Sequence, residues 1–321
     1  AKLYSFGIDV NEKEIIKPRA LKKGDTIGVV APARYIDGDF SEAVALIESR
    51  GYKVKLGETC FLKDNGFAGT PKQRADDVNR FFADDEVDAI LCLRGGSGSM
   101  DMIGMLDYDM IKKHPKMFIG FSDITAVHSA LYKKCGLVTV HGPMVSNLSG
   151  EMGAVSGYTV SQLFDGIGGN VTDITLPEGG ELTALCCGTA QGRIVGGNLS
   201  LICRLIDTPY AVDARGNILV IEDTHESAES IRRKLEILSD SGVTDECAGI
   251  VFGQFTDSED SDGESWKDVI TDFAEKTGKP CIMGLPAGHE NDNMFLPLGV
   301  TARMTADENG SGIELLESIY E

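Results

Sequence analysis

The fold is decided by residues 116–135, which read KMFIGFSDITAVHSALYKKC. The apolar run from Lys116 to Phe121 predicts a buried strand, and residues 123–135 predict a helix that ends before Gly136. Ser122 lies at the turn between the two elements. Because a strand followed at once by a helix is the repeating unit of parallel α/β sheets, this stretch predicts an α/β fold.

The same alternation of strand and helix continues on both sides of this stretch. A threonine followed by a proline, at positions 70 and 71, is the signature of a helix start. Such a pattern predicts right-handed connections, helices on both faces of a mostly parallel sheet, and ligand sites at the carboxyl ends of the strands. The remaining predicted strands span residues 27–31, 87–93 and 137–140, and the remaining predicted helices span residues 40–50 and 70–83.

Glycines interrupt this pattern between residues 148 and 180, which favours a junction between two domains there. We therefore expect an N-terminal α/β domain over residues 1–165, a linker over residues 166–185, and a smaller, β-rich C-terminal domain over residues 186–321. An amphipathic helix is predicted over residues 227–239 of the second domain. Its predicted strands span residues 191–195, 218–221, 249–252, 300–304 and 312–316.

The composition is that of an ordinary globular protein, with 42% hydrophobic and 25% charged residues in a chain of 321. The net charge of −20 argues against nucleic acid or an anionic membrane as a partner, because both need clustered lysine and arginine.

No apolar run is long enough to span a membrane, and residues 1–19 lack the apolar core of a signal peptide. The eight cysteines are scattered without a C-x-x-C motif, so we expect reduced thiols in a cytoplasmic protein.

Two turns could supply the groups of a hydrolytic site. Ser122 lies where a strand meets a helix, so its hydroxyl should project above the sheet edge and the N–H of Asp123 should lie at a helix N-terminus. The turn from Arg94 to Gly98 fits neither a phosphate loop nor a dinucleotide fingerprint, and Gly96 could instead aim its N–H at an oxyanion. A helix-capping serine and an ordinary tight turn remain the alternatives.

Five histidines are candidates for a general base. His289 lies in a Gly/Pro-rich loop that follows an apolar run, a rigid setting that suits such a role. Glu222 ends an apolar strand and could orient the imidazole, although Asp223 competes for that role on sequence grounds. A purely structural role stays open for each of these residues. The other histidines are His114, His128, His141 and His225.

The sequence predicts no metal site and no cofactor. The acidic stretch over residues 257–263 resembles a calcium loop only superficially, because Ser258 and Val269 occupy the first and last ligand positions when Gly263 is taken as the invariant glycine. No cysteine and histidine cluster has zinc spacing. We expect the acidic stretch to be a solvated loop.

Taken in order, these segments resemble the LD-carboxypeptidase family of serine peptidases, which includes murein tetrapeptide carboxypeptidases and microcin C self-immunity proteins. The resemblance covers nearly the whole chain, and its strength lies in the ordered set rather than in any single motif. It implies a flavodoxin-like, class I glutaminase-like N-terminal domain and a β-rich C-terminal domain. The motifs are LKKGDTIGVVAP at 21–32, RGG at 94–96, GFSDIT at 120–125, HGPM at 141–144, GGNLS at 196–200, IED at 221–223 and GH at 288–289.

The resemblance also implies the reaction and its residues. Ser122 would be the nucleophile, His289 the base and Glu222 its partner, with an oxyanion hole formed by the N–H groups of Gly96 and Asp123. The substrate would be a cytoplasmic murein tetrapeptide, which loses its terminal D-alanine during peptidoglycan recycling, and the protein would be a homodimer. We expect two further side chains, Arg94 and Asn198, to contact the terminal carboxylate.

Two other functions remain open at this stage. A microcin-C-immunity-type hydrolase of peptidyl-nucleotide conjugates would need an aromatic platform, and the chain has a single tryptophan, Trp266. A non-catalytic, amidotransferase-like binding protein would not need Ser122, Glu222 and His289 together. The chain departs from the family pattern at Ser97 and Ala287, and both positions bear on substrate preference.

Overall fold

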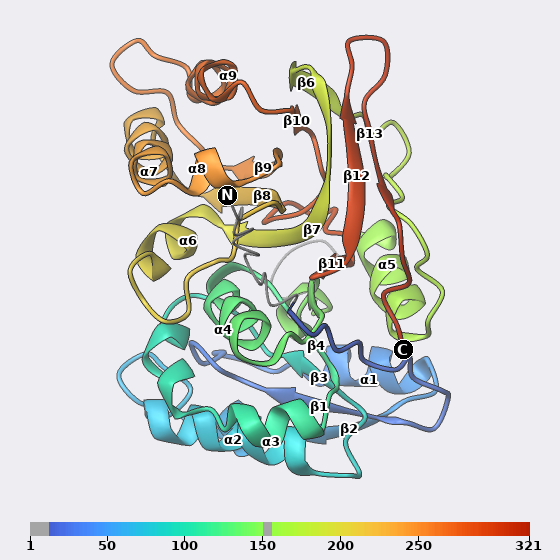
Figure 1. The fold of residues 1–321 in the computed structure, drawn as a ribbon. Coiled ribbons are helices and arrows are strands. Elements are labelled where there is room, and N and C mark those ends of the chain that lie inside the picture. The colour runs from blue at the N-terminus through green and yellow to red at the C-terminus, as the bar shows by residue number, and fades with distance from the viewer. Residues whose placement is uncertain (1–12, 150–155) are drawn as a thin grey trace, which may run out of the picture.

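The computed structural model describes residues 13–149 and 156–321 and contains two sheets, one above the other in Figure 1. In the first sheet the strands run in the order β11-β5-β4-β3-β1-β2. All neighbours are parallel except β11, which pairs antiparallel with β5. The order 2-1-3-4-5 of the first five strands is that of flavodoxin-like sheets, as predicted. These strands are β1 (Thr26–Val30), β2 (Lys53–Leu56), β3 (Ala89–Cys92), β4 (Met117–Gly120), β5 (Thr139–His141) and β11 (Leu296–Leu298).

Helices cover both faces of the first sheet and enclose a separate apolar core on each. On one face lie α1 and α5, and on the other lie α2, α3 and α4. The start of α2 is fixed by a capping box between Thr70 and Gln73 with Pro71 in the first turn, as the sequence predicts. The helices are α1 (Ser41–Ser49), α2 (Pro71–Ala83), α3 (Tyr108–Lys113), α4 (Thr125–Cys135) and α5 (Gly157–Ile167).

Helix α5 lies within the glycine-rich region, where no element was expected. Its side chains Leu163, Phe164 and Ile167 are buried in the same core as β1 and β3. Gly166 permits this packing, because a Cβ at that position would lie 2.3 Å from the ring of Phe295. The glycines of this region therefore include one that serves helix packing rather than a turn.

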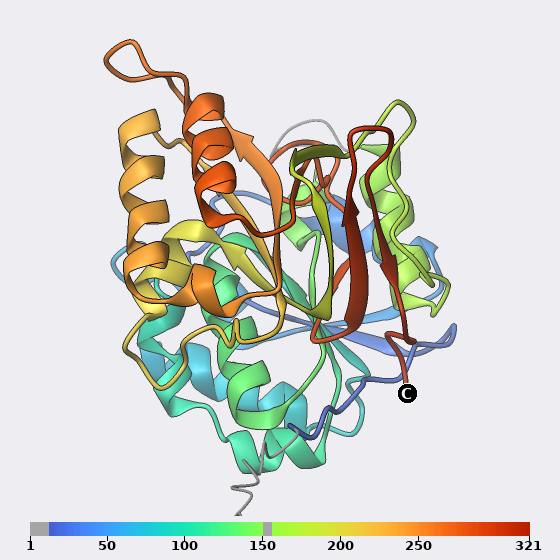
Figure 2. The same cartoon turned by 45° about the horizontal axis from the view of Figure 1, so that its top comes forward.

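The second sheet is mixed, with the strand order β13-β12-β7-β8-β9-β10-β6. Its middle four strands, β7 to β10, are parallel, while β12, β13 and β6 add antiparallel edges. Figure 2 shows α7 and α9 packed together on one side of this sheet. The strands are β6 (Thr183–Cys186), β7 (Gly188–Asn198), β8 (Ile218–Thr224), β9 (Gly249–Thr256), β10 (Cys281–Met283), β12 (Thr301–Ala306) and β13 (Gly312–Leu315), and the helices are α6 (Leu199–Leu205), α7 (Ala228–Asp240), α8 (Val243–Glu246) and α9 (Trp266–Thr277).

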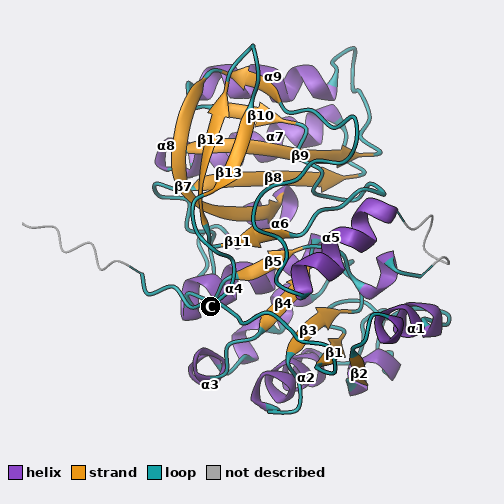
Figure 3. Cartoon of the chain, turned by 90° about the vertical axis from the view of Figure 1, so that its right-hand side faces the viewer, coloured by secondary structure: helices purple, strands orange, loops and turns teal. Residues whose placement is uncertain are grey.

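One strand crosses between the two halves of the chain. After β10 the chain leaves the second sheet, and β11 adds to the edge of the first sheet beside β5 (Figure 3). Leu296 pairs with His141 and Leu298 pairs with Thr139. The segment between β10 and β11 carries His289, so this crossing attaches the His289 loop to the sheet that carries Ser122.

The cysteines and the lengths of the helices can be read from the structure. All eight cysteines lie in the described part of the chain, and none of them forms a disulfide. Among residues 13–149 and 156–321, no helix combines the length and apolar character that a membrane crossing requires.

Candidate active site

Ser122 occupies a strained turn between β4 and α4. Its φ of 65° lies in the left-handed region, which a residue with a side chain seldom adopts. A short 3-10 turn over Ser122–Ile124 leads into α4. Gly95 lies against the serine, because a Cβ built there would be 3.4 Å from the Ser122 Oγ. The turn thus presents the hydroxyl at the carboxyl end of the sheet, in the manner of a nucleophile elbow.

A chain of hydrogen bonds links three side chains from different parts of the sequence. His289 Nε2 lies 2.9 Å from Ser122 Oγ, and His289 Nδ1 lies 2.9 Å from Glu222 Oε2. Glu222 is fully buried, whereas the side chain of His289 is 20% exposed. Ser122 comes from the first sheet and Glu222 from β8 of the second. This geometry matches a serine–histidine–carboxylate triad.

The electrostatics of the pair favour a charged carboxylate and a basic imidazole. Burial by itself would raise the pKa of Glu222, but its contacts with His141 and His289 lower that pKa to about 2. Burial would likewise lower the pKa of His289, but the hydrogen bond and the charge of Glu222 raise it above 6.5. An imidazole with a raised pKa is a stronger base for a serine hydroxyl.

Backbone geometry brings the His289 loop close to Glu222. Gly288 has a φ of 145°, and a Cβ there would lie 2.9 Å from the Gln254 Cβ and 3.3 Å from the Glu222 Oε2. The N–H of Gly288 donates to Asn293 Oδ1, and the N–H of Glu290 donates to Gln254 Oε1. The loop is therefore held on both sides of His289, and glycine is required directly before it.

The predicted oxyanion donors lie in the two turns beside Ser122. Gly96 has a φ of 112°, and its N–H donates to no other group in the described chain. Asp123 is the second residue of the 3-10 turn over Ser122–Ile124, and the first N–H groups of a helix have no partner within it. Asp123 is anchored from the opposite side, since its Oδ2 accepts from the N–H of Ser99 at 2.9 Å and its carbonyl accepts from the Ser99 hydroxyl. These contacts fix the turn that carries the Asp123 N–H.

Two arginines lie beside the turn that contains Gly95 and Gly96. Arg94 donates to the Tyr35 carbonyl, and its Nε is buried without a partner among the described residues. Arg34 is exposed, and its stem packs on Gly96, where a Cβ would lie 2.5 Å from the Arg34 Cδ. Burial and the neighbouring charge of Arg34 lower the pKa of Arg94. Arg34 was not predicted, and its only signal was its place just beyond the end of β1.

The structure gives Asn198 different partners from those predicted. Its amide nitrogen donates to Glu222 Oε1 at 3.3 Å and to Asp223 Oδ1 at 3.2 Å, and its oxygen caps α6 by accepting from Leu201. Only 4% of the residue is exposed. The side chain is therefore engaged in holding two carboxylates, which leaves it no free donor for a substrate.

The hydrogen-bond partners of Glu222 and Asp223 show which of the two acids can orient His289. Asp223 accepts from the N–H and the hydroxyl of Ser200 and from the N–H of Thr224. Burial raises the pKa of Asp223. Glu222, by contrast, is the acid that contacts His289. The sequence could not separate them, because adjacent residues on a strand point to opposite faces and the buried direction was unknown.

The remaining histidines have other surroundings. His114 ends α3, and His225 is 75% exposed near Asp257. His128 is fully buried beneath the Ser122 turn, where its Nε2 lies 2.7 Å from the Gly120 carbonyl. His141 is fully buried beside Glu222, a position that sequence reasoning missed, although it belongs to the HGPM motif.

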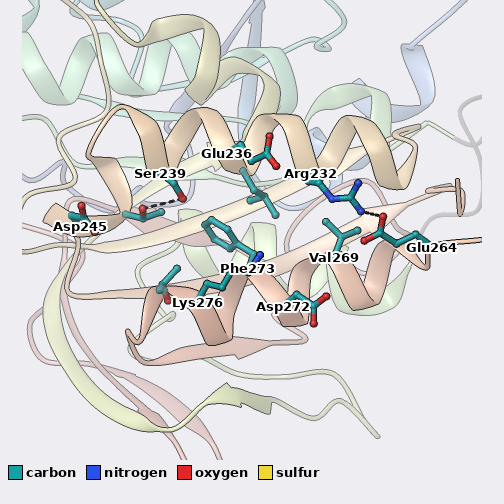
Figure 4. A pocket seen from close by; sticks show the side chains of 12 residues that line it. Arg232, Glu236, Ser239, Asp245, Glu264, Val269, Asp272, Phe273 and Lys276 are labelled. Atoms are coloured by element: carbon teal, nitrogen blue, oxygen red, sulfur yellow. Dashed lines mark hydrogen bonds and ion pairs between the residues drawn. The ribbon is translucent and has the colours of Figure 1, made fainter. Parts of the chain in front are cut away.

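A separate hollow lies between α7 and α9, with a volume of about 420 Å³ (Figure 4). Arg232 forms an ion pair with Glu264 at one end, and the Thr244 hydroxyl donates to Ser239 at the other. None of Ser122, Glu222 and His289 lines it. Within the described residues, no group of three or more His, Cys, Asp or Glu side chains is arranged to hold a metal ion.

Comparison with known proteins places this geometry in a family. The profile of the LD-carboxypeptidase N-terminal domain matches residues 27–142, and that of the LD-carboxypeptidase C-terminal domain matches residues 191–304. A Bacillus subtilis protein named "Probable murein peptide carboxypeptidase" is 37% identical over 93% of this chain and 94% of its own length.

Solved structures agree with this assignment. The muramoyltetrapeptide carboxypeptidase from Oxalobacter formigenes is 26% identical and has a TM-score of 0.80 over 91% of this chain and 99% of its own. The Escherichia coli microcin C7 self-immunity protein MccF is 27% identical over 92% of this chain and 94% of its own length. A mutant MccF structure with adenosine monophosphate has a TM-score of 0.87, covering 95% of this chain and all of the other. The chain therefore belongs to the LD-carboxypeptidase family of serine peptidases.

Proposed function

We propose that this protein hydrolyses the amide between the diamino acid and the terminal D-alanine of a murein tetrapeptide. The observation that carries the proposal is the unbroken chain of hydrogen bonds from Ser122 through His289 to Glu222. The substrate class is supported by relatives named for murein peptides from Bacillus subtilis and Oxalobacter formigenes.

In the proposed mechanism, Ser122 Oγ attacks the scissile carbonyl while His289 Nε2 takes its proton. The tetrahedral intermediate collapses when the C–N bond breaks, and the protonated His289 gives its proton to the departing amine of D-alanine. Water then attacks the acyl-enzyme, with His289 again as base, and releases the shortened peptide. Glu222 holds the imidazole in the right tautomer and stabilises its charged form.

The N–H groups of Asp123 and Gly96 would hold the developing oxyanion. Both lie in turns next to Ser122. The Gly96 N–H donates to no other group of the described chain, and the Asp123 N–H lies at the start of a 3-10 turn. Removal of one such donor costs about 3 kcal/mol in a characterised serine peptidase. Every step uses side chains and backbone groups, so the reaction should proceed in the presence of a chelator.

An enzyme that removes one terminal residue must also recognise a free carboxylate. Arg94 and Arg34 are basic side chains next to Gly95 and Gly96, in the turn that lies against Ser122, in a protein whose net charge is −20. No ion pair is formed by either guanidinium within the described chain. We assign the carboxylate of D-alanine to this pair, while Asn198 serves instead to hold Glu222.

The direct test is to incubate the protein with L-Ala-γ-D-Glu-meso-diaminopimelate-D-Ala in the presence of EDTA and follow the peptide by mass spectrometry. Wild type should release one D-alanine, Ser122→Ala should release none, and the surface variant Ser49→Ala should match wild type. A folded wild-type protein that leaves the tetrapeptide intact would refute the murein assignment.

The carboxylate assignment has its own test. Arg94→Gln should raise KM for the tetrapeptide about tenfold with a smaller effect on kcat, whereas Arg215→Gln, whose side chain is 82% exposed, should not. With a C-terminally amidated tetrapeptide, wild type and Arg94→Gln should be equally slow. Equal KM values for the free acid in wild type and Arg94→Gln would show that Arg94 does not bind the carboxylate.

The alternative is a hydrolase of peptidyl-nucleotide conjugates, and the likeness to MccF favours it as the second candidate. Trp266, the aromatic residue that could bind a base, stacks on Phe255 at a centroid distance of 5.9 Å. A peptidyl-nucleotide conjugate assayed beside the tetrapeptide separates the two functions, because the better substrate has the higher kcat/KM.

The domain boundaries, location and assembly are also part of the proposal. We place the nucleophile on an N-terminal domain over residues 1–165 and its partners on a C-terminal domain over residues 186–321, in a cytoplasmic homodimer. The free thiols support a reducing compartment. Sedimentation velocity at two protein concentrations would distinguish a dimer from a monomer.

A further inference from the structure

His141 lies fully buried at the carboxyl end of β5, next to the catalytic carboxylate. Its Nε2 is 3.9 Å from Glu222 Oε1, and neither residue has any exposed side-chain surface. In the sheet, His141 pairs with Gly120 on one side and with Leu296 on the other. It therefore belongs to the sheet that carries Ser122, whereas Glu222 belongs to the other sheet.

The two ring nitrogens of His141 have no hydrogen-bond partner among the described residues. A buried polar group without a partner costs about 1–3 kcal/mol, so its presence calls for an explanation. The ring of Phe121 lies on one side, with a centroid distance of 5.7 Å. The titratable groups that the structure places near His141 are Glu222 on β8 and His128 on α4.

Glu222 has one oxygen for each of two sets of partners. Oε2 faces His289 at 2.9 Å, while Oε1 accepts from Asn198 at 3.3 Å and faces His141 at 3.9 Å. A movement of about 1 Å would bring His141 within ordinary hydrogen-bond distance of Oε1. The carboxylate thus lies between two imidazoles, and only one of them contacts Ser122.

We propose that His141 is a positioning residue, which holds Glu222 by its second oxygen and so aligns the carboxylate with the sheet that carries Ser122. This inference rests on the proposed triad. His141 would share the negative charge of Glu222 with His289, and this sharing weakens the pull of Glu222 on the His289 proton. Loss of His141 should therefore raise the pKa of His289.

The test compares His141→Leu with His141→Gln. Leucine removes the donor and also the unpartnered polar group, so the variant should fold, while glutamine keeps an N–H in a similar place. We expect His141→Leu to lower kcat about tenfold with little change in KM, and to move the acid limb of kcat/KM to higher pH. His141→Gln should restore most of kcat and should bring the acid limb back close to its wild-type pH. His225→Gln should match wild type.

An NMR titration of the His289 ring in the same variants gives a readout that needs no substrate. If wild type fails to cleave the tetrapeptide, the proposed substrate is wrong, but a raised pKa of His289 in His141→Leu would still support the positioning role. An unchanged His289 pKa in His141→Leu would overturn that role. So would equal losses of rate in the leucine and glutamine variants with an unmoved pH profile, because such losses would indicate packing alone.

Discussion

At the scale of single residues, Ser122 combines a strained backbone with a base at hydrogen-bond distance. Its φ of 65° is unfavourable for a residue with a Cβ, and the surrounding turn holds it in place. Sequence reasoning named Ser122 from its position between strand and helix, although the G-x-S-x-G pattern fails at Ile124. The strand–turn–helix context was the useful signal, because it is the context that exposes the hydroxyl.

The pair of Glu222 and His289 predicts the pH dependence of the reaction. In the proposed mechanism His289 must be neutral to accept the proton of Ser122, and its pKa is raised above 6.5. Activity should therefore be full above that raised pKa and fall as the pH drops through it. Burial lowers the pKa of His289, and Glu222→Gln removes the hydrogen bond and the charge that chiefly raise it, leaving only the smaller effect of Asp223, so the acid limb should move to lower pH. In addition kcat should fall by about 10³–10⁴-fold, as in triads that lose their carboxylate.

The measurement is kcat/KM for the tetrapeptide between pH 5 and pH 9. Asp223→Asn provides a demanding comparison, because Asp223 is adjacent but contacts Ser200 rather than His289. That variant should keep a larger share of the rate than Glu222→Gln. Equal losses in both variants would contradict the assignment of Glu222 as the orienting acid.

At the scale of elements, the loop between β10 and β11 depends on Gly288. A side chain at Gly288 would meet both Gln254 and Glu222, and its φ of 145° disfavours any other residue. We expect Gly288→Ala to displace His289 and to lower kcat by at least tenfold, with a smaller change in stability. The measurement is kcat for the tetrapeptide together with a thermal unfolding curve.

The chain offers a matched control for this substitution. Gly310 has a similar φ of 154°, but a Cβ there would meet nothing within 4 Å. Gly310→Ala should therefore share the backbone strain and keep the wild-type kcat. If both variants lost activity equally, backbone strain rather than the fit of Gly288 against Glu222 would be the cause.

At the scale of the whole molecule, the site exists only because two sheets meet. The N–H of Asn198, at the end of β7, donates to Thr125 Oγ1 at the start of α4, which fixes one sheet against the other near Ser122. The addition of β11 to the first sheet provides a second connection. The alignment of Ser122 with His289 is thus a property of the packed molecule.

Acid stability should also be a property of the whole fold, through His128. Burial lowers the pKa of His128 to about 3, whereas the unfolded chain titrates near 6.5. As the pH falls below about 6.5, His128 binds a proton in the unfolded state but not in the folded state. The free energy of unfolding should therefore decrease by about 1.4 kcal/mol per pH unit. His128→Gln keeps a donor for the Gly120 carbonyl but does not titrate. The variant should therefore lack this contribution to the pH dependence of the free energy of unfolding.

Urea unfolding at pH 7.0, 6.0 and 5.0 measures this dependence. The exposed His225 supplies the comparison, since His225→Gln should leave the slope as in wild type. If the free energy of unfolding changed equally with pH in wild type and in His128→Gln, His128 would bind its proton in the folded state as well.

The strands and helices of the first sheet were largely predictable, and several later elements were not. Strands β1, β3 and β4 are short runs of buried apolar residues, and α2 and α4 have clear end signals, so local chemistry was sufficient. Helix α5 was not predicted because glycines interrupt its pattern, and β11 was not predicted because prolines lie in and near it. The second sheet was predicted as β-rich, and its four central parallel strands emerged only from their pairing.

The sequence by itself determined the alternation of elements, the turn that carries Ser122 and the ordered motifs of the family, because these depend on neighbours along the chain. Only the tertiary structure decided which acid faces His289, that Asn198 holds carboxylates, and that His141 and Arg34 lie at the site. These are contacts between residues far apart in the sequence, such as Glu222 and His141, and they follow from how two sheets pack and from which face of a strand is buried. The order of neighbouring residues along the chain does not specify how the two sheets pack.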